Sequence, residues 1–392
     1  MKLRPSKLFL YSSILLAFDS VLKVPFLGFY IQAGVLSFLL FAILEGLNKY
    51  NRKKITLNVD YGILLITLYL LLHCILAINI GIYFKMLLYF LIPLFFYITF
   101  KSLIFSTDVL HNTAKIVLII LIISGLMEYG LKNYFNIHLE FKDMNTEYYL
   151  NNGDLAKRLR GFFLEPNWYG LSIFSWLYVY FRSAKFKGLL FYSVILLSLF
   201  CLILSGNRLI LLFILLLSIA WFLKPRLIKI QGSLFLITII TSVILFFLLA
   251  LNMDFLDDRS AIARFYTASN VYSELKKSSI LNLLFGFGFS NWGVYSNLLE
   301  LSWSNYLFDQ ALTRRDNSEL YVVFFELGLF GGMLFLLDII LLANKRNADF
   351  IDKVFFFLFY FAAMFYPIFT FITYLIPVIL IRARIYQETK WQ

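Results

Sequence analysis

Long runs of apolar residues, separated by short polar stretches, dominate the chain. Most runs are close to the roughly 20 residues that an α-helix needs to cross the hydrocarbon core of a bilayer. We therefore predict membrane-spanning helices at about 7–26, 28–47, 61–80, 83–100, 115–131, 163–181, 188–204, 207–223, 233–251 and 318–342.

The last apolar stretch, from Val354 to Ile381, is too long for one untilted helix. It contains Pro367, and proline disrupts a helix interior because it lacks an N–H donor and clashes with the preceding turn. We predict two short spans that turn near Tyr366-Pro367, which gives 12 spans, with one tilted span and a total of 11 as the alternative. The expected fold class is all-α: a polytopic membrane protein with a single integral membrane domain over 1–392.

Lysine and arginine predict the orientation of the spans. Cytoplasmic loops of membrane proteins carry an excess of these residues. Alternating the predicted spans keeps nearly every basic cluster on one side, starting from Lys2, Arg4 and Lys7 at the N-terminus. The opposite, outer side then receives two larger loops, at about 132–161 and 252–317.

Composition supports this class. The chain is 61% hydrophobic and 15% charged, whereas soluble domains average about 45–50% apolar and about 25% charged residues. The formal net charge is +12, but most basic residues lie in short loops, so we assign the charge to topology and anionic lipid headgroups and expect no nucleic-acid partner. Cys74 and Cys201 each lie in an apolar run and indicate neither a disulfide nor a metal site. We expect no metal and no cofactor.

Three arginines stand on the predicted outer side, where the orientation rule does not require them. Arg158 and Arg160 come just before a span, and Arg208 opens another. A guanidinium group is well suited to forked binding of phosphate oxygens. The alternative for Arg208 is contact with outer lipid headgroups. Glu165 follows Arg158 and Arg160 and is a candidate base. Its alternative role is to favour the start of a helix, where an acidic side chain is stabilising.

The second outer loop carries four more arginines. Arg259 and Arg264 lie on a predicted amphipathic surface helix, where lipid headgroups are the alternative partner. Arg314 and Arg315 precede Asp316 at the opening of a span. Asp316 fits a helix N-cap, or a general base if burial raises its pKa.

The order of four motifs resembles the O-antigen polymerase and O-antigen ligase superfamily. The motifs are Arg-Leu-Arg-Gly-Phe-Phe-Leu-Glu-Pro-Asn (158–167), Ser-Gly-Asn-Arg (205–208), Phe-Gly-Phe-Gly-Phe (285–289) and a stretch from Asp316 to Gly331 that begins Asp-Asn-Ser-Glu-Leu-Tyr. The ligase branch typically has histidine where this chain has Asp316, which favours the polymerase branch. Some polymerases have Arg and Gly ten residues apart in two outer loops, but Arg160 and Gly170 do not match that spacing.

The resemblance implies a GT-C-like, metal-independent glycosyltransferase in the bacterial inner membrane, a Wzy-type polymerase. Its substrates would be glycan repeat units on undecaprenyl diphosphate, as donor and acceptor, and its partners the lipid bilayer, a Wzz-like chain-length regulator and a flippase. We predict Arg208, Asp316 and Glu165 as catalytic residues. The predicted diphosphate-binding residues are Arg158, Arg160, Arg259, Arg264, Arg314 and Arg315.

Two other functions stay open at this point. One is the ligase of the same superfamily, which transfers polymer to lipid A-core. The other is a transporter that flips lipid-linked glycan across the membrane. Such transporters often show internal repeats and charges along a central cavity, and the sequence shows neither repeats nor many charges within its spans.

Overall fold

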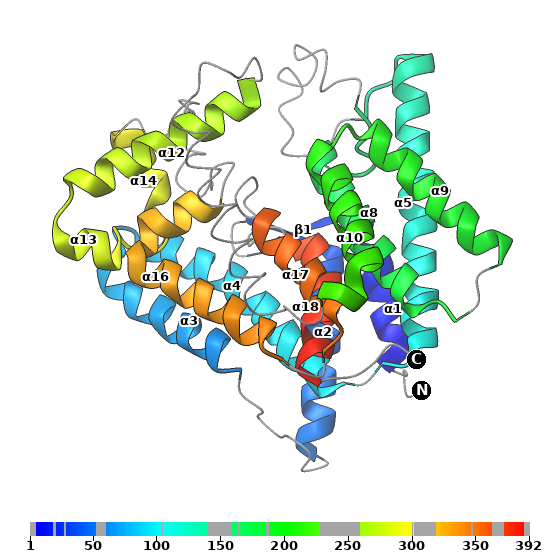
Figure 1. The fold of residues 1–392 in the computed structure, drawn as a ribbon, viewed down its shortest axis with the longest axis horizontal. Coiled ribbons are helices and arrows are strands. Elements are labelled where there is room, and N and C mark those ends of the chain that lie inside the picture. Colours follow the sequence, from blue (N-terminus) through cyan, green and yellow to red (C-terminus); the bar gives the residue numbers. More distant parts are fainter. Residues whose placement is uncertain are drawn as a thin grey trace. The chain divides into compact units, whose positions relative to one another are not determined.

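The computed structural model describes residues 5–18, 21–26, 29–51, 60–103, 105–139, 158–163, 165–185, 188–227, 259–299, 301, 319–345, 348–362 and 372–387. The described chain is mostly helical, as predicted (Figure 1). It divides into two compact units that interleave in sequence. Unit 1 comprises Met1–Thr56, Ile92–Ile219 and Ile372–Gln392, and unit 2 comprises Leu57–Leu91 and Ala220–Phe371. The division into two units does not test the predicted single membrane domain, which stays a prediction.

Unit 1 is a bundle of apolar helices. Its elements are α1 (Pro5–Leu16), β1 (Lys23–Phe26), β2 (Phe29–Gln32), α2 (Ala33–Asn51), α5 (Thr107–Phe135), α8 (Pro166–Ser183), α9 (Leu189–Leu204), the first part of α10 (Arg208–Leu227), the second part of α4 (Ile80–Ser102) and α18 (Ile372–Gln387). Helix α5 packs against α1, α8 and α9, and α8 also packs against α18. Because Phe9 is fully buried and makes ring contacts with Phe38, Phe100 and Phe105, aromatic packing anchors the N-terminal helix.

The first predicted span, 7–26, is wrong in its second half. Helix α1 ends at Leu16, and the segment after it forms the antiparallel hairpin β1–β2, in which Val24 pairs with Ile31. Pro25 lies in β1 and has no N–H for a helical hydrogen bond, which disfavours a helix that continues to residue 26. Its position in a two-stranded hairpin, where every strand is an edge, is one that proline tolerates.

Unit 2 combines helices from its two sequence segments, Leu57–Leu91 and Ala220–Phe371. They are α3 (Tyr61–Leu72), the 3₁₀-helix η1 (His73–Leu76), the first part of α4, the end of α10, α12 (Arg259–Lys277), α13 (Ile280–Phe285), α14 (Trp292–Leu298), α16 (Glu319–Ala343) and α17 (Phe350–Ala362). The predicted outer loop 252–317 is therefore largely helical where it is described. The last apolar stretch holds parts of two helices, α17 and α18, and the predicted turn at Tyr366-Pro367 lies outside the described residues.

Three of the described helices are long and apolar enough to cross a membrane, as expected of a membrane protein. They are Ile80–Ser102, Thr107–Phe135 and Leu320–Ala343. Shorter apolar helices occur at Ala33–Asn48, Tyr61–Leu76, Leu189–Leu204 and Arg208–Phe222. The predicted span 233–251 lies outside the described residues. The number of 11 or 12 spans and the orientation stay predictions.

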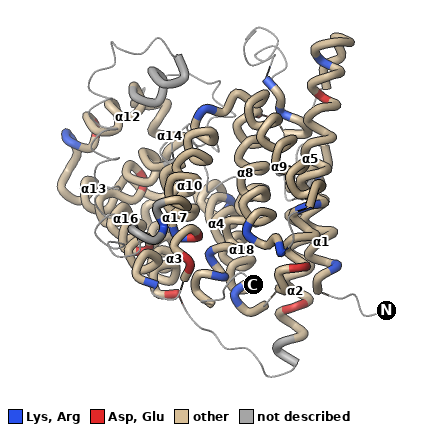
Figure 2. The backbone as a smooth tube through the Cα atoms, turned by 45° about the vertical axis from the view of Figure 1, so that its right-hand side comes forward, with Lys and Arg blue, Asp and Glu red and all other residues tan. Residues whose placement is uncertain are grey.

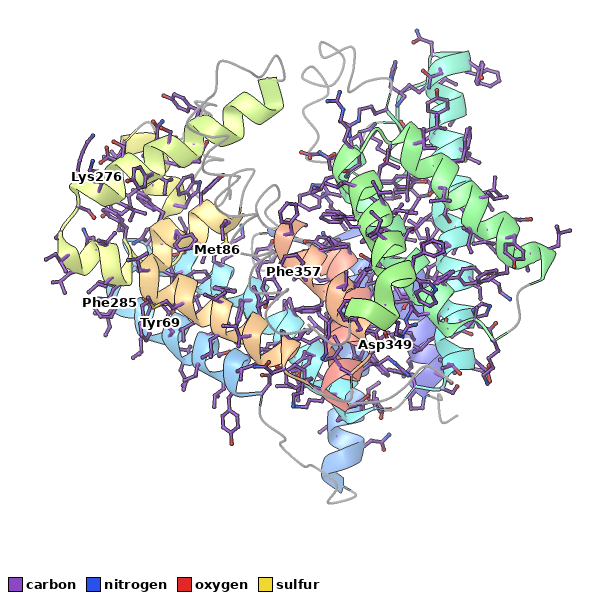
Figure 3. The ribbon with its side chains drawn as sticks, in the orientation of Figure 1. Tyr69, Met86, Lys276, Phe285, Asp349 and Phe357 are labelled. Carbon is purple, nitrogen blue, oxygen red and sulfur yellow. The ribbon has the colours of Figure 1, made fainter. Side chains whose placement is uncertain are left out.

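Helix α16 is broken near its middle. Gly328 has φ 65° and ψ −168°, so the regular backbone hydrogen bonds cannot pass through it. The carbonyl oxygens before the break find other donors: the Phe287 N–H binds Phe325 O at 2.9 Å and the Gly288 N–H binds Glu326 O at 3.0 Å. The Tyr69 hydroxyl of α3 donates to Leu327 O at 2.8 Å. Figure 3 shows Tyr69 and Phe285 beside this helix.

Candidate functional site

A cluster of charged and amide side chains lies in unit 1 where α5, α8, α9 and α10 come together. We call it the arginine cluster. In Figure 2, basic positions are seen near the upper ends of α5 and α9. The members of the arginine cluster are Glu128 and Lys132 of α5, Arg158 and Arg160 of the segment before α8, Asn167 of α8, and residues Ser205–Arg208 at the turn from α9 into α10.

Two residues, Gly206 and Asn207, shape the short turn between α9 and α10. Gly206 has φ 62°, in the left-handed region that favours glycine, and it follows the last residues of α9. The Asn207 Oδ1 atom accepts the Ile210 N–H at 3.3 Å, which caps the start of α10. Arg208 is therefore placed at the first position of α10, where its side chain is exposed.

Arg158 joins the two motifs that precede α8 and α10. Its Nε donates to Ser205 O at 2.7 Å, and its Nη2 donates to Asn167 Oδ1 at 3.0 Å. The backbone supports the same contact, since the Leu159 N–H donates to Leu204 O at 3.1 Å. The predicted grouping of the two motifs on one side of the protein is consistent with this direct contact.

Glu128 organises the other half of the arginine cluster. Its carboxylate lies 3.3 Å from Lys132 Nζ and 3.4 Å from Arg160 Nε, and its Oε2 accepts the Arg160 backbone N–H at 3.4 Å. Glu128 and Arg160 are almost completely buried, at 1% and 4% exposure. Lys132 Nζ also donates to Arg158 O at 2.7 Å. The carboxylate thus fixes the backbone that carries both arginines.

The three predicted arginines of this cluster differ in what they offer to a ligand. Arg160 is buried against Glu128 and donates through Nη2 to Leu139 O at 2.7 Å. Arg158 is half-buried and holds the turn after α9. Arg208 is exposed. Arg160 is therefore best placed to support the site, and Arg208 to contact a bound group.

Two helix N-termini meet in the cluster. The Asn207 Nδ2 donates to Asn167 O at 3.4 Å, so the starts of α10 and α8 lie side by side. A helix N-terminus carries the equivalent of roughly half a positive charge and unpaired N–H groups, which favour anions such as phosphate. Glu165 is the half-buried N-cap of α8, and its side chain makes no capping hydrogen bond to that helix. With Arg158 and Arg208, the arrangement can hold an anion.

The other predicted site residues are elsewhere. Arg259 and Arg264 lie on α12 in unit 2, and their side chains are not among those described. Arg314, Arg315 and Asp316 lie outside the described residues altogether. Within the part of the chain that the structure covers, no three His, Cys, Asp or Glu side chains come close enough to hold a metal ion.

Glu128 and Lys132 are functional candidates that the sequence interpretation missed. The available signal was an acidic residue inside an otherwise apolar span, followed four positions later by lysine. Ionisable residues in spans usually face a partner, and i,i+4 pairs lie on one helix face. Their contact with Arg160 could not be inferred, because it joins positions 32 residues apart.

Gly206→Ala tests how tightly the turn is built. An added Cβ would lie 2.8 Å from Arg158 Nε, and the left-handed φ costs a residue with a side chain about 1–2 kcal/mol. We expect the variant to lower the midpoint of thermal unfolding in detergent and to displace Arg158. The control is Gly130→Ala on α5, where nothing lies within 4 Å of an added Cβ. Equal midpoints for the two variants would contradict the described turn.

No protein-family model matches the chain, and no characterised protein matches it significantly.

Proposed function

We propose that the chain is a membrane-embedded polysaccharide polymerase. It joins glycan repeat units carried on undecaprenyl diphosphate at the periplasmic face of the bacterial cytoplasmic membrane. The observation that carries this proposal is the arginine cluster, in which two helix N-termini meet beside Arg158 and Arg208. This chemistry suits a diphosphate, and the cluster is built by two of the motifs that resemble the O-antigen polymerase and ligase superfamily.

In the proposed reaction, a sugar hydroxyl of the acceptor unit attacks the anomeric carbon of the growing glycan. A new glycosidic C–O bond forms, the bond to the lipid diphosphate breaks, and the diphosphate leaves with the electron pair. A carboxylate, Glu165 or Asp316, takes the proton from the attacking hydroxyl. Preorganised donors aimed at the developing negative charge give the main rate enhancement in such sites.

The arginines have separate roles in this scheme. Arg208, exposed at the start of α10, contacts the leaving diphosphate, and Arg158 contributes from the half-buried position beside Asn167. Arg160 supports the site without contacting the substrate directly, because Glu128 and Leu139 O hold its guanidinium. Arg259, Arg264, Arg314 and Arg315 of the second outer loop stay proposals for diphosphate binding that rest on the sequence. No metal ion or cofactor takes part, and a chain-length regulator and a flippase act alongside the enzyme.

Deletion of the gene tests this function against its two alternatives. We expect the lipid-linked and surface glycans of the deletion strain, separated on a gel, to show a lipid core that carries a single repeat unit and no ladder. Long polymer that stays on the carrier lipid would identify a ligase. Repeat units trapped on the cytoplasmic leaflet would identify a flippase, and an unchanged ladder would overturn all three functions.

A further inference from the structure

Unit 2 contains a segment whose surface is apolar although the sequence places it in a loop. The segment runs from Ser279 to Leu299 and includes α13 and α14. Helix α13 begins at a serine cap, since the Ser279 Oγ accepts the Asn282 N–H at 3.2 Å. Its side chains Ile280 and Leu281 are 75% and 68% exposed, and Leu284 and Phe285 are also exposed. With only six residues it cannot cross a membrane.

The residues after α13 bind to the broken part of α16. The Phe287 and Gly288 N–H groups donate to Phe325 O and Glu326 O at 2.9 and 3.0 Å, just before the break at Gly328. The candidate membrane span Leu320–Ala343 begins eight residues before Gly328. At a rise of 1.5 Å per residue, the two acceptor carbonyls lie about 8 to 9 Å into that span, inside a hydrocarbon core about 30 Å thick.

Protein groups bind most of the polar groups in the irregular stretch after α13, although the buried Ser290 Oγ has no hydrogen-bond partner in the described structure. The Asn291 Nδ2 donates to Leu76 O at 2.8 Å and to Phe287 O at 2.7 Å, while its Oδ1 accepts the Ile78 N–H at 3.1 Å. The Phe289 N–H donates to His73 Nδ1 at 3.1 Å. Irregular backbone at membrane depth is tolerated only where it is buried in protein or lines a wet cavity, and this segment meets the first condition.

The exposed apolar side chains of α13 belong to a larger surface. Helix α3, which packs against α16, exposes Leu68 and Leu72, and α16 exposes Phe330 and Met333 beyond its break. Phe285 of α13 and Phe330 of α16 lie in ring contact, with centroids 6.2 Å apart. The apolar surface of α13 is therefore continuous with that of α16, which is long enough to span the bilayer, and Figure 3 shows Phe285 of α13 beside α16.

We propose that Ser279–Leu299 is a re-entrant segment. It enters the bilayer beside α16, places α13 against lipid acyl chains, and returns to the side from which it came. Lys276 and Lys277, which end α12 just before it, mark the level of the headgroups. The break at Gly328 exists to accept this segment, because the freed carbonyl oxygens of α16 bind its N–H groups. The proposal concerns membrane insertion and does not depend on the glycan chemistry.

Oxygen and nickel-chelate accessibility of spin labels tests the proposal in the full-length protein in phospholipid vesicles. Leu281→Cys and Leu284→Cys would be labelled in a background with Cys74→Ala and Cys201→Ala. We expect both labels to be accessible to oxygen, which concentrates in hydrocarbon, and protected from a water-soluble nickel chelate. The control is Lys277→Cys, four positions before Leu281, whose label should be accessible to the chelate.

Two outcomes would overturn the proposal. One is chelate accessibility at positions 281 and 284 equal to that at position 277. The other is unchanged accessibility when Gly286→Val is added. An added Cβ at Gly286 would collide with Glu326 O, and Gly286 has φ 80°, so the variant should detach the segment from α16. Protection that persists without this contact would mean that the break at Gly328 does not hold the segment in place.

Discussion

Replacement of Arg208 by alanine is expected to remove polymerisation while the protein remains folded and inserted. Arg208 is exposed at the first position of α10, so its replacement removes no side chain from the buried core. Arg208 opens α10, whose start lies beside the start of α8, and helix N-termini favour anions. Loss of one preorganised donor to a developing negative charge typically lowers the rate about 100- to 1000-fold. The measurement is the glycan ladder of a deletion strain complemented with the variant, with membrane levels of the protein checked in parallel.

Two further variants show whether charge alone explains the effect. Arg208→Lys keeps the charge and loses the planar fork that binds two phosphate oxygens together, so we expect it to remain poor. Lys185→Ala removes another exposed basic side chain, one paired with Asp108 at 3.1 Å and distant in sequence from the motifs. It should give a normal ladder. Wild-type chain lengths in Arg208→Ala would remove Arg208 from the proposed site.

The periodicity of the chain predicted its helices well where apolar runs were uniform. The expected spans at 83–100, 188–204 and 318–342 correspond to α4, α9 and α16. The hairpin β1–β2 was missed because a continuous apolar run is compatible with a strand as well as with a helix. The tendency of Pro25 to disrupt a helix was not taken into account. The break of α16 at Gly328 depends on hydrogen bonds from residues about 40 positions earlier, and no local pattern encodes such a partner.

The candidate site was predictable in part. The motifs around Arg158 and Arg208 were singled out because the orientation rule does not require arginine on the outer side. The structure places the two motifs in contact through Ser205 O. Sequence could not distinguish a buried arginine from an exposed one, so both Arg160 and Arg208 were predicted to act directly on the substrate, as a diphosphate-binding and a catalytic residue. The difference comes from Glu128 on α5, a helix that the sequence interpretation treated only as a span. The partners of a charge at membrane depth are set by tertiary packing.

Replacement of Glu128 by alanine is expected to destabilise the protein strongly. Glu128 is 1% exposed, and its carboxylate lies within 3.4 Å of Arg160 Nε and 3.3 Å of Lys132 Nζ. Removing one member of a buried ion pair typically costs about 3–5 kcal/mol, because the remaining charge stays desolvated without its counterion. We expect a large drop in the midpoint of thermal unfolding in detergent, and a low yield of folded protein.

A double variant separates this electrostatic cost from lost packing. Lys132→Met keeps an unbranched side chain of similar length while it removes one of the two cations beside Glu128. Combined with Glu128→Gln, it should regain part of the stability that Glu128→Gln alone loses, because fewer buried charges lack a counterion. Strictly additive losses in the two single variants would mean that Glu128 and Lys132 do not interact energetically. In that case the electrostatic stabilisation by Glu128 would come from its contacts with Arg160 and not from Lys132.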